Sequence, residues 1–316
     1  EAIVAITAGE VVRSRRYAAD TAPYGQPQYL FEEYERAAEL VKASPEWRAA
    51  MERRGLSDRI DLAFCTPLAP GFVGRENEVG RRVIRSLTFL RDSEDDIAWA
   101  HPVEGLIVHI DLTADKVIGI EDEGDVPVPS GSGRYDPGAT GPARTTLKPI
   151  EITQPEGPSF HVEGSHVQWE NWTLRADFNA REGLVLHDVR FDDRPVLSRA
   201  SVPEMVVPYG DTSNTRFWIS YFDAGEYLLG KNANHLELGC DCLGVIHYFD
   251  GHVADDHGHA MRIPNAVCMH EEDYGVLWKH TEPGPVGSHV RRSRRLVVSY
   301  FATIGNYDYG FFWRSE

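Results

Sequence analysis

The runs WTLRADF at residues 172–178, GLVLHDVRF at 183–191 and RRLVVSYFATI at 294–304 decide the fold class of this 316-residue chain. Each run is short and rich in Val, Ile, Leu and aromatic residues, and Gly, Asp, Asn and Pro turns separate it from its neighbours. The runs FWISYF, GVIHYF and YGVLWKH lie between them and have a similar composition. Many short strands joined by close turns are typical of antiparallel sandwiches. The sequence therefore predicts a partial antiparallel β-sandwich over residues 147–316.

A smaller unit precedes the sandwich. Residues 30–41 place apolar side chains at helical spacing, and Ser44-Pro45 is a typical start for a second helix that Gly55 ends. Four further runs read as strands, and the last two form a hairpin; they are residues 59–65, 82–90, 106–112 and 116–122. Helices followed by a meander of strands predict a small α+β domain at residues 21–126.

The segments around these two domains are less regular. Residues 127–146 are dense in Pro, Gly and Ser, so we expect a linker without a regular element. Residues 1–20 hold two short strands with no earlier element to pair with, and we interpret them as the end of a truncated N-terminal domain. The chain ends on an apolar strand, FFWRSE, which predicts that a further polypeptide completes the sandwich. A frayed tail is the alternative.

Composition restricts the partners and the compartment. The chain carries 49 Asp and Glu against 32 Lys and Arg, and its net charge of −17 argues against nucleic acid as a partner. It has neither an apolar run of roughly eighteen residues nor a basic, apolar start, so we expect no membrane span, no signal peptide and a cytoplasmic location. Its four cysteines are too few for a disulfide scaffold, and buried thiols are the simplest interpretation.

Two motifs point to chemistry. Residues 303–309, TIGNYDY, resemble the topaquinone motif of copper amine oxidases, in which a modified tyrosine follows Asn and precedes an acidic residue and Tyr. Residues 221–227, YFDAGEY, resemble the segment of that family that carries the catalytic base. Further matches follow in the family's order, among them AWAHP at 98–102, MVVPYGD at 205–211, LGCDCLG at 238–244 and CMHEE at 268–272. Any single motif is weak, but the ordered set covers nearly the whole chain.

The resemblance implies oxidative deamination of a primary amine to an aldehyde, with dioxygen consumed and ammonia and hydrogen peroxide released. Tyr307 would become topaquinone, an electron sink whose carbonyl accepts the amine as a Schiff base. Asp223 would take the proton from the neighbouring carbon, which requires a pKa raised by burial. Tyr209 would hydrogen-bond a quinone oxygen, and Asn306 would orient the ring. Strand alternation places Tyr221 on the same face as Asp223, where it could gate the site.

The resemblance also implies a substrate channel. Besides Tyr221, its candidate residues are Tyr227, Trp99, Tyr34 and Asn232. Asn232 stands where some members of the family carry a bulky ring, which favours a small polar amine such as ethanolamine over phenylethylamine. Ordinary core or turn roles remain the alternative for Tyr209, Tyr221 and Asn306.

The same resemblance pairs two of the cysteines. Cys242 and Cys268 match the positions of the family's structural disulfide. In the chain-entropy model, a bond that closes a loop of this size stabilises the fold by about 3 kcal/mol. Such a bond, once buried, could persist even in a reducing compartment.

The copper ligands that the resemblance implies are not found at the expected place in this sequence. The resemblance implies three histidine ligands, all after the quinone tyrosine, yet only nine residues follow Tyr307. The pair His257 and His259 has H-x-H spacing but precedes Tyr307 in an acidic, turn-rich loop, so we expect it to be solvated. We therefore expect no metal ligand on this chain. A second subunit would supply the copper histidines and the rest of the sandwich, assembled as a dimer of heterodimers or larger. An inactive fragment and a non-catalytic scaffold or binding module are the alternatives.

Overall fold

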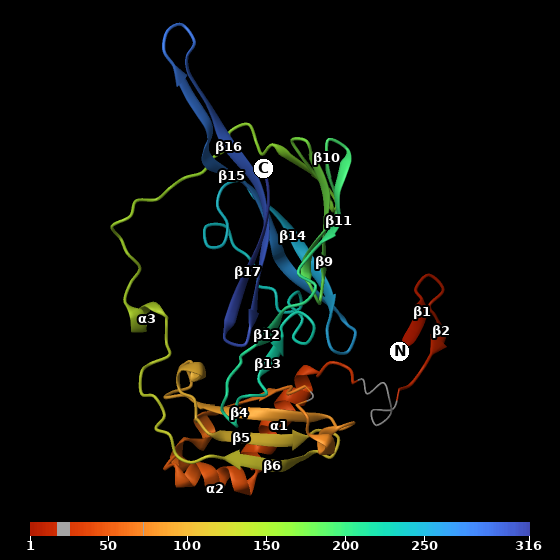
Figure 1. Cartoon of the computed structure of the whole chain (residues 1–316), viewed down its shortest axis with the longest axis vertical. Coiled ribbons are helices and arrows are strands. Elements are labelled where there is room, and N and C mark those ends of the chain that lie inside the picture. Colours follow the sequence, from red (N-terminus) through yellow and green to blue (C-terminus); the bar gives the residue numbers. More distant parts are fainter. Residues whose placement is uncertain (18–25, 72) are drawn as a thin grey trace. The chain divides into compact units, whose positions relative to one another are not determined.

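The computed structural model describes residues 1–17, 26–71 and 73–316, and the chain divides into two units (Figure 1). The first unit comprises Glu1–Ala143 and Pro208–Ser220, and the second comprises Arg144–Val207 and Tyr221–Glu316. The expected boundary between residues 20 and 21 lies outside the described residues. Within the described part of the chain, no helix has the length and apolar character needed to cross a membrane.

The first unit is built on a four-stranded antiparallel sheet in the order β3-β4-β5-β6 (Figure 1). Its strands are β3 (Ala63–Leu68), β4 (Val83–Leu90), β5 (Leu106–Asp111) and β6 (Lys116–Asp122). Helices α1 (Phe31–Ala43) and α2 (Pro45–Arg53) pack their apolar side chains against one face, where Ile84, Val108 and Ile110 lie. Strands β4 and β5 are buried along their whole length, so the opposite face is covered as well. Polar side chains on that face therefore need partners inside the protein.

Local signals explain where helix α2 begins. The hydroxyl of Ser44 accepts a hydrogen bond from the backbone N–H of Trp47 at 3.3 Å, and Pro45 occupies the first helical position of α2, as predicted.

The strand predicted at 59–65 is wrong in its first half. Residues Ser57–Leu62 form the 3-10 helix η1, and β3 starts at Ala63. Residues 59–62 (RIDL) alternate polar and apolar side chains as a half-buried strand does, so the local pattern does not distinguish η1 from a strand here.

The prediction that residues 127–146 hold no regular element is also wrong at one place, where a short helix, α3 (Pro137–Thr140), forms. The carboxylate of Asp136 caps it by accepting a hydrogen bond from the N–H of Gly138 at 2.9 Å. Asp136-Pro137 is the same start signal as Ser44-Pro45 and could have been recognised. The remaining elements of this unit are the hairpin of β1 (Ala2–Ala5) and β2 (Glu10–Ser14) and the 3-10 helices η2 (Glu76–Glu78) and η3 (Ala98–Ala100).

The second unit confirms the predicted antiparallel sandwich. One sheet has the order β11-β10-β9-β8-β7 and the other β14-β15-β16-β17. The first sheet comprises β7 (Phe160–Glu163), β8 (His166–Trp169), β9 (Trp172–Asn179), β10 (Gly183–Phe191) and β11 (Arg194–Ala200). The second comprises β14 (His247–Ala254), β15 (Ala260–Glu282), β16 (Gly287–Ile304) and β17 (Tyr307–Ser315). Both sheets contribute to one core, which includes Leu184, Leu186, Val267, Met269 and Val298.

Two short strands, β12 (Val206–Pro208) and β13 (Ser220–Phe222), form a separate two-stranded ribbon. The run FWISYF was expected to be a strand throughout, but only its last three residues are. The indole N–H of Trp218 donates a hydrogen bond to the carbonyl of Thr215 at 2.7 Å, and this contact closes a turn before the strand begins.

The structure contains the disulfide Cys242–Cys268, which joins a loop to β15. Both half-cystines are buried, whereas Cys240 is an exposed free thiol and therefore contradicts the expectation of buried thiols. Cys65 is buried and free, and burial raises the pKa of its thiol to about 12.

Removing this disulfide should lower the free energy of unfolding by about 3 kcal/mol, because the unfolded chain regains the freedom of a 26-residue separation. Urea unfolding of the double variant Cys242→Ala/Cys268→Ala measures the loss. The matched control is Cys240→Ala, an exposed position where a change within about 0.5 kcal/mol is expected. Equal stability of the double variant and this control would contradict the prediction.

Candidate active site

Asp223 lies directly after β13 and is 3% exposed. Its backbone N–H donates to the carbonyl of Met205 at 3.0 Å, and its Oδ2 accepts a hydrogen bond from the hydroxyl of Tyr309. Burial raises the pKa of the Asp223 carboxyl, the negative charge of Glu204 raises it further, and the hydrogen bond from Tyr309 opposes the rise. A carboxyl with a raised pKa that holds one fixed hydrogen bond can exchange protons closer to neutral pH than an ordinary aspartate.

A second carboxyl, Glu226, lies in the same turn and was not singled out from the sequence. Its backbone N–H donates to the carbonyl of Phe222 at 2.7 Å, which closes the turn. Its Oε1 is buried and has no hydrogen-bond partner among the described residues. Burial, followed by the charges of Asp223 and Glu204, raises the pKa of Glu226 to about 7. Two sequence signals could have marked it: Glu226 is part of the segment YFDAGEY that resembles the family's base-bearing segment, and it lies three residues after Asp223.

The raised pKa of Glu226 predicts a pH-dependent stability. From its ordinary value of 4.5 up to about 7, the folded carboxyl keeps a proton that the unfolded chain releases. The free energy of unfolding therefore falls as the pH rises through this window, by about 2 kcal/mol once the remaining solvent contact is allowed for.

Urea unfolding of the protein and of Glu226→Gln at pH values from 5 to 8 should show the glutamine variant gaining relative stability toward alkaline pH. The matched control is Glu163→Gln, an exposed carboxyl on β7. Parallel pH curves for the protein and Glu226→Gln would refute the assignment.

Tyr307 is the first residue of β17 and pairs with Ile304 across a two-residue turn. Gly305 adopts a φ of +58° at the first turn position, a conformation that only glycine enters readily. Tyr307 is 47% exposed, and its ring centroid lies 6.4 Å from that of Tyr309. The two side chains share a face of the strand because they are two residues apart. Since Tyr309 reaches Asp223, the structure brings the two predicted catalytic residues to one end of the sandwich through a tyrosine that the sequence reasoning had not assigned.

The other predicted site residues fall into both units. In the second unit, the rings of Tyr221 and Tyr227 lie 6.1 Å apart, and Asn306 forms the turn before Tyr307. The side-chain amide of Asn232 donates to the carbonyls of Tyr227 at 2.6 Å and Leu228 at 3.0 Å. These two hydrogen bonds hold the turn at Tyr227–Leu228 in place.

Three further predicted residues belong to the first unit. The Trp99 ring packs edge-on against Phe64 at 5.2 Å and against Phe89 at 5.0 Å. Tyr34 lies 5.8 Å from the Tyr29 ring, and Tyr209 follows β12. The roles proposed for these residues stay predictions.

The described residues do not build a copper site beside Tyr307. They contain two clusters with metal-ligand spacing, Cys242/Cys268/His270 and Asp92/Asp96/His101, and neither includes Tyr307 or Asp223. The sulfur atoms of the first cluster are joined in the disulfide. The pair His257 and His259 sits at a turn, where Nδ1 of His259 lies 3.2 Å from Asp255.

Two family profiles match the chain. The profile described as "Copper amine oxidase, enzyme domain" covers residues 161–315, and the profile described as "Copper amine oxidase, N3 domain" covers residues 32–136. The fold and these matches define an oxidase catalytic domain preceded by a smaller α+β domain. The chain belongs to the copper amine oxidase family, whose enzymes use copper and topaquinone.

Individual relatives give the extent of the match. The primary amine oxidase of Arthrobacter sp. (strain P1) is 48% identical over 99% of this chain, which covers 48% of that protein. The histamine oxidase of Arthrobacter globiformis is 50% identical over 92% of the chain, which covers 43% of that protein. A copper-containing benzylamine oxidase from Hansenula polymorpha superposes with a TM-score of 0.85 at 29% identity, over 99% of this chain and 50% of that one. The chain thus spans about half the length of the curated relatives it matches.

Proposed function

We propose that this chain contributes the quinone and the catalytic base of a primary amine oxidase, which converts an amine and dioxygen to an aldehyde, ammonia and hydrogen peroxide. The observation that supports it best is the buried Asp223 carboxyl, whose pKa is raised and which Tyr309 connects to the strand that begins with Tyr307. Topaquinone formed from Tyr307 would act as the electron sink. Asp223 would remove the proton from the substrate.

The proton transfer follows from the contacts of Asp223. The hydroxyl of Tyr309 donates to Oδ2 and favours the ionised carboxylate, which is the form that accepts a proton. Oδ1 is then the atom that takes the proton from the carbon next to the amine nitrogen. Burial keeps water from competing for the carboxylate and raises its pKa, so that Asp223 can also return the proton.

Copper is the second cofactor of the proposal, and its histidines would come from a second subunit that also completes the sandwich. We expect the assembly to be a dimer of heterodimers or larger. A longer continuous chain could supply the same ligands, since each relative named above is matched over only about half its length. Native mass spectrometry with copper analysis of the purified protein separates the two. Copper bound to a single continuous chain would refute the second subunit.

The substrate we propose is a small polar primary amine such as ethanolamine. The support is Asn232, whose compact amide bonds to the carbonyls of Tyr227 and Leu228 and stands where, by the family resemblance, some members carry a bulky ring. Two relatives are named for other amines, methylamine and histamine. Initial rates of peroxide release with ethanolamine, methylamine, histamine and phenylethylamine test the choice. Faster turnover of phenylethylamine than of ethanolamine would refute it.

The cellular location is also a proposal, and we propose the cytoplasm. A diamine oxidase of Nicotiana tabacum and a primary amine oxidase of Pichia angusta are named as peroxisomal, which makes the peroxisome the alternative in a eukaryotic host. Fractionation of cells with an antibody to the protein distinguishes these locations.

Titration with phenylhydrazine tests the proposed function directly, because hydrazines react with a quinone carbonyl. The copper-loaded protein should give a new visible absorbance band with about one reactive carbonyl per Tyr307. A protein that binds copper and stays colourless would refute the oxidase. That result would favour the non-catalytic scaffold or binding module.

A further inference from the structure

The loop that joins β12 to β13, residues 209–219 and here called the connecting loop, begins at one predicted catalytic residue and is followed, beyond β13, by another. Tyr209 is its first residue, and Asp223 follows β13. The backbone N–H of Tyr209 donates to the carbonyl of Ile219 at 3.2 Å and closes the neck of the loop. At the other end of the ribbon, the N–H of Asp223 donates to the carbonyl of Met205 at 3.0 Å. A shift of the connecting loop therefore moves the backbone of Tyr209.

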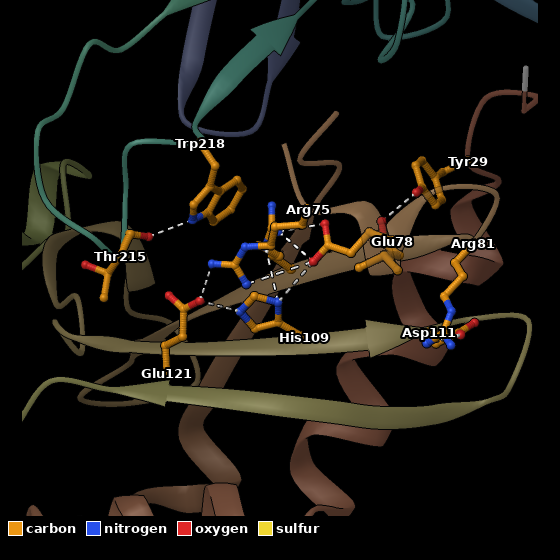
Figure 2. Close-up of polar contacts among 11 residues, drawn as sticks. Tyr29, Arg75, Glu78, Arg81, His109, Asp111, Glu121, Thr215 and Trp218 are labelled. Carbon is orange, nitrogen blue, oxygen red and sulfur yellow. Dashed lines mark hydrogen bonds and ion pairs between the residues drawn. The ribbon is translucent and has the colours of Figure 1, made fainter. Parts of the chain in front are cut away.

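The connecting loop belongs to the first unit, where Trp218 fixes it. Trp218 is 3% exposed although it lies in a turn, and its indole N–H is bonded to the carbonyl of Thr215. The guanidinium of Arg85 lies over the Trp218 ring, 5.2 Å from its centroid. Arg216 of the connecting loop also forms an ion pair with Glu104 at 2.6 Å. Both side chains of this pair are more exposed to solvent than Trp218 and Arg85. Figure 2 shows Trp218 and Thr215 of the loop beside Glu78, His109 and Glu121.

Arg85 is a rigid support because it is completely buried on β4. Its Nη2 donates to both carboxylate oxygens of Glu78 at 2.8 Å, and its Nε donates to Nδ1 of His109 at 3.3 Å. Nε2 of His109 lies 3.1 Å from Glu121, which in turn pairs with Arg75 at 2.6 Å (Figure 2).

The Nη1 group of the Arg85 guanidinium is not used in these contacts. Its Nη1 is buried and has no hydrogen-bond partner among the described residues. A buried cation with an unpaired donor is costly, and an aromatic face offsets part of that cost. The Trp218 ring thus adds to the stabilisation that Glu78 gives the buried Arg85.

We propose that Arg85 and Trp218 are positioning residues of the oxidase: the buried cation holds the connecting loop and thereby sets the placement of Tyr209, the first residue of that loop. This inference rests on the proposed function, because the contact of Tyr209 with a quinone oxygen, which the family resemblance implies, requires the quinone of that oxidase. Misplacing a reacting group by about 1 Å can cost on the order of 100-fold in rate.

Two variants test the proposal, each with a matched control in the same unit. Trp218→Leu removes the aromatic face but keeps an apolar side chain, and Trp47→Leu is its control, since Trp47 is also buried but bonds to Thr88 on the helix-covered face. Arg85→Met removes the buried cation. Arg54→Met is its control, because the Arg54 side chain is 3% exposed and pairs with Asp122.

Three readouts separate positioning from stability. In Trp218→Leu and Arg85→Met we expect kcat to fall about 10–100-fold with little change in KM. We also expect a shifted absorption maximum of the phenylhydrazine adduct, since Tyr209 would contact a quinone oxygen. Trypsin should cleave after Arg216 faster than in the controls. Trp218→Phe, which retains a ring face, should restore most of each signal.

The failures are distinguishable. If the unaltered protein forms the adduct and both variants match their controls in kcat, adduct spectrum and trypsin cleavage, the positioning role is overturned. If the unaltered protein forms no adduct, the proposed function itself fails and the catalytic part of this inference fails with it. Trypsin cleavage still shows whether Arg85 and Trp218 hold the connecting loop.

Discussion

Replacing Asp223 with asparagine should lower kcat of the copper-loaded enzyme by roughly 10²–10⁴-fold while the quinone still forms. The amide has almost the same shape as the carboxylate, and its oxygen can still accept the hydrogen bond from Tyr309. It cannot accept the substrate proton at neutral pH. Stopped-flow measurement of quinone reduction, with an amine deuterated on the carbon next to nitrogen, follows the affected step.

The control for this variant is Asp273→Asn, which alters an exposed, ion-paired carboxylate on the distal part of β15. Its kcat should stay within about twofold of that of the unaltered enzyme. Phenylhydrazine titration must give equal quinone content in all three proteins, so that a lower rate reflects proton transfer. Undiminished turnover in Asp223→Asn would show that another group is the base, and Glu226 would then be the next candidate, because its carboxyl has a pKa of about 7.

Replacing Tyr307 with phenylalanine should abolish the phenylhydrazine-reactive chromophore and all amine oxidation. Phenylalanine lacks the phenolic oxygen that activates the ring toward oxygenation, so the quinone has no precursor. The fold should tolerate the change, because the side chain is 47% exposed and the strand pairing with Ile304 uses only the backbone. Mass measurement of the tryptic peptide that contains residue 307 and the visible spectrum both report the loss.

Tyr309→Phe is the matched control, since it removes a phenol two positions further on the same strand face. This variant should retain a full quinone titre. A chromophore that persists in Tyr307→Phe and disappears in Tyr309→Phe would move the quinone to Tyr309. It would also break the correspondence with the family motif.

The regular elements with a strong local signal could be predicted from the sequence. The run at residues 183–191 forms β10 with unchanged bounds, because its buried half is a continuous apolar segment. The strand at 59–65 could not be placed correctly, since residues 59–62 alternate polar and apolar side chains as a strand does and yet belong to the 3-10 helix η1. The disulfide was predicted only through the family resemblance, because four cysteines allow three pairings.

The partners within the candidate site could not be predicted. Alternation puts Tyr307 and Tyr309 on one face of a strand, but the bond from Tyr309 to Asp223 spans a sequence separation of 86 residues. Arg85 was overlooked for a related reason: a charged residue inside the apolar run VIRSLTFL reads as a solvent-facing position, whereas β4 is covered on both faces. Burial of this kind depends on which distant loop covers the sheet, and no local pattern carries that information.

The exposed thiol of Cys240 governs how the protein has to be handled. It stands two positions before Cys242, close enough in an unfolded chain to attack the bond between Cys242 and Cys268. Thiol–disulfide exchange proceeds through the thiolate and therefore accelerates with rising pH, so denaturation above neutral pH would exchange sulfur partners and trap mispaired chains on refolding. Alkylating Cys240 in the folded state, before denaturant is added, should make refolding reversible.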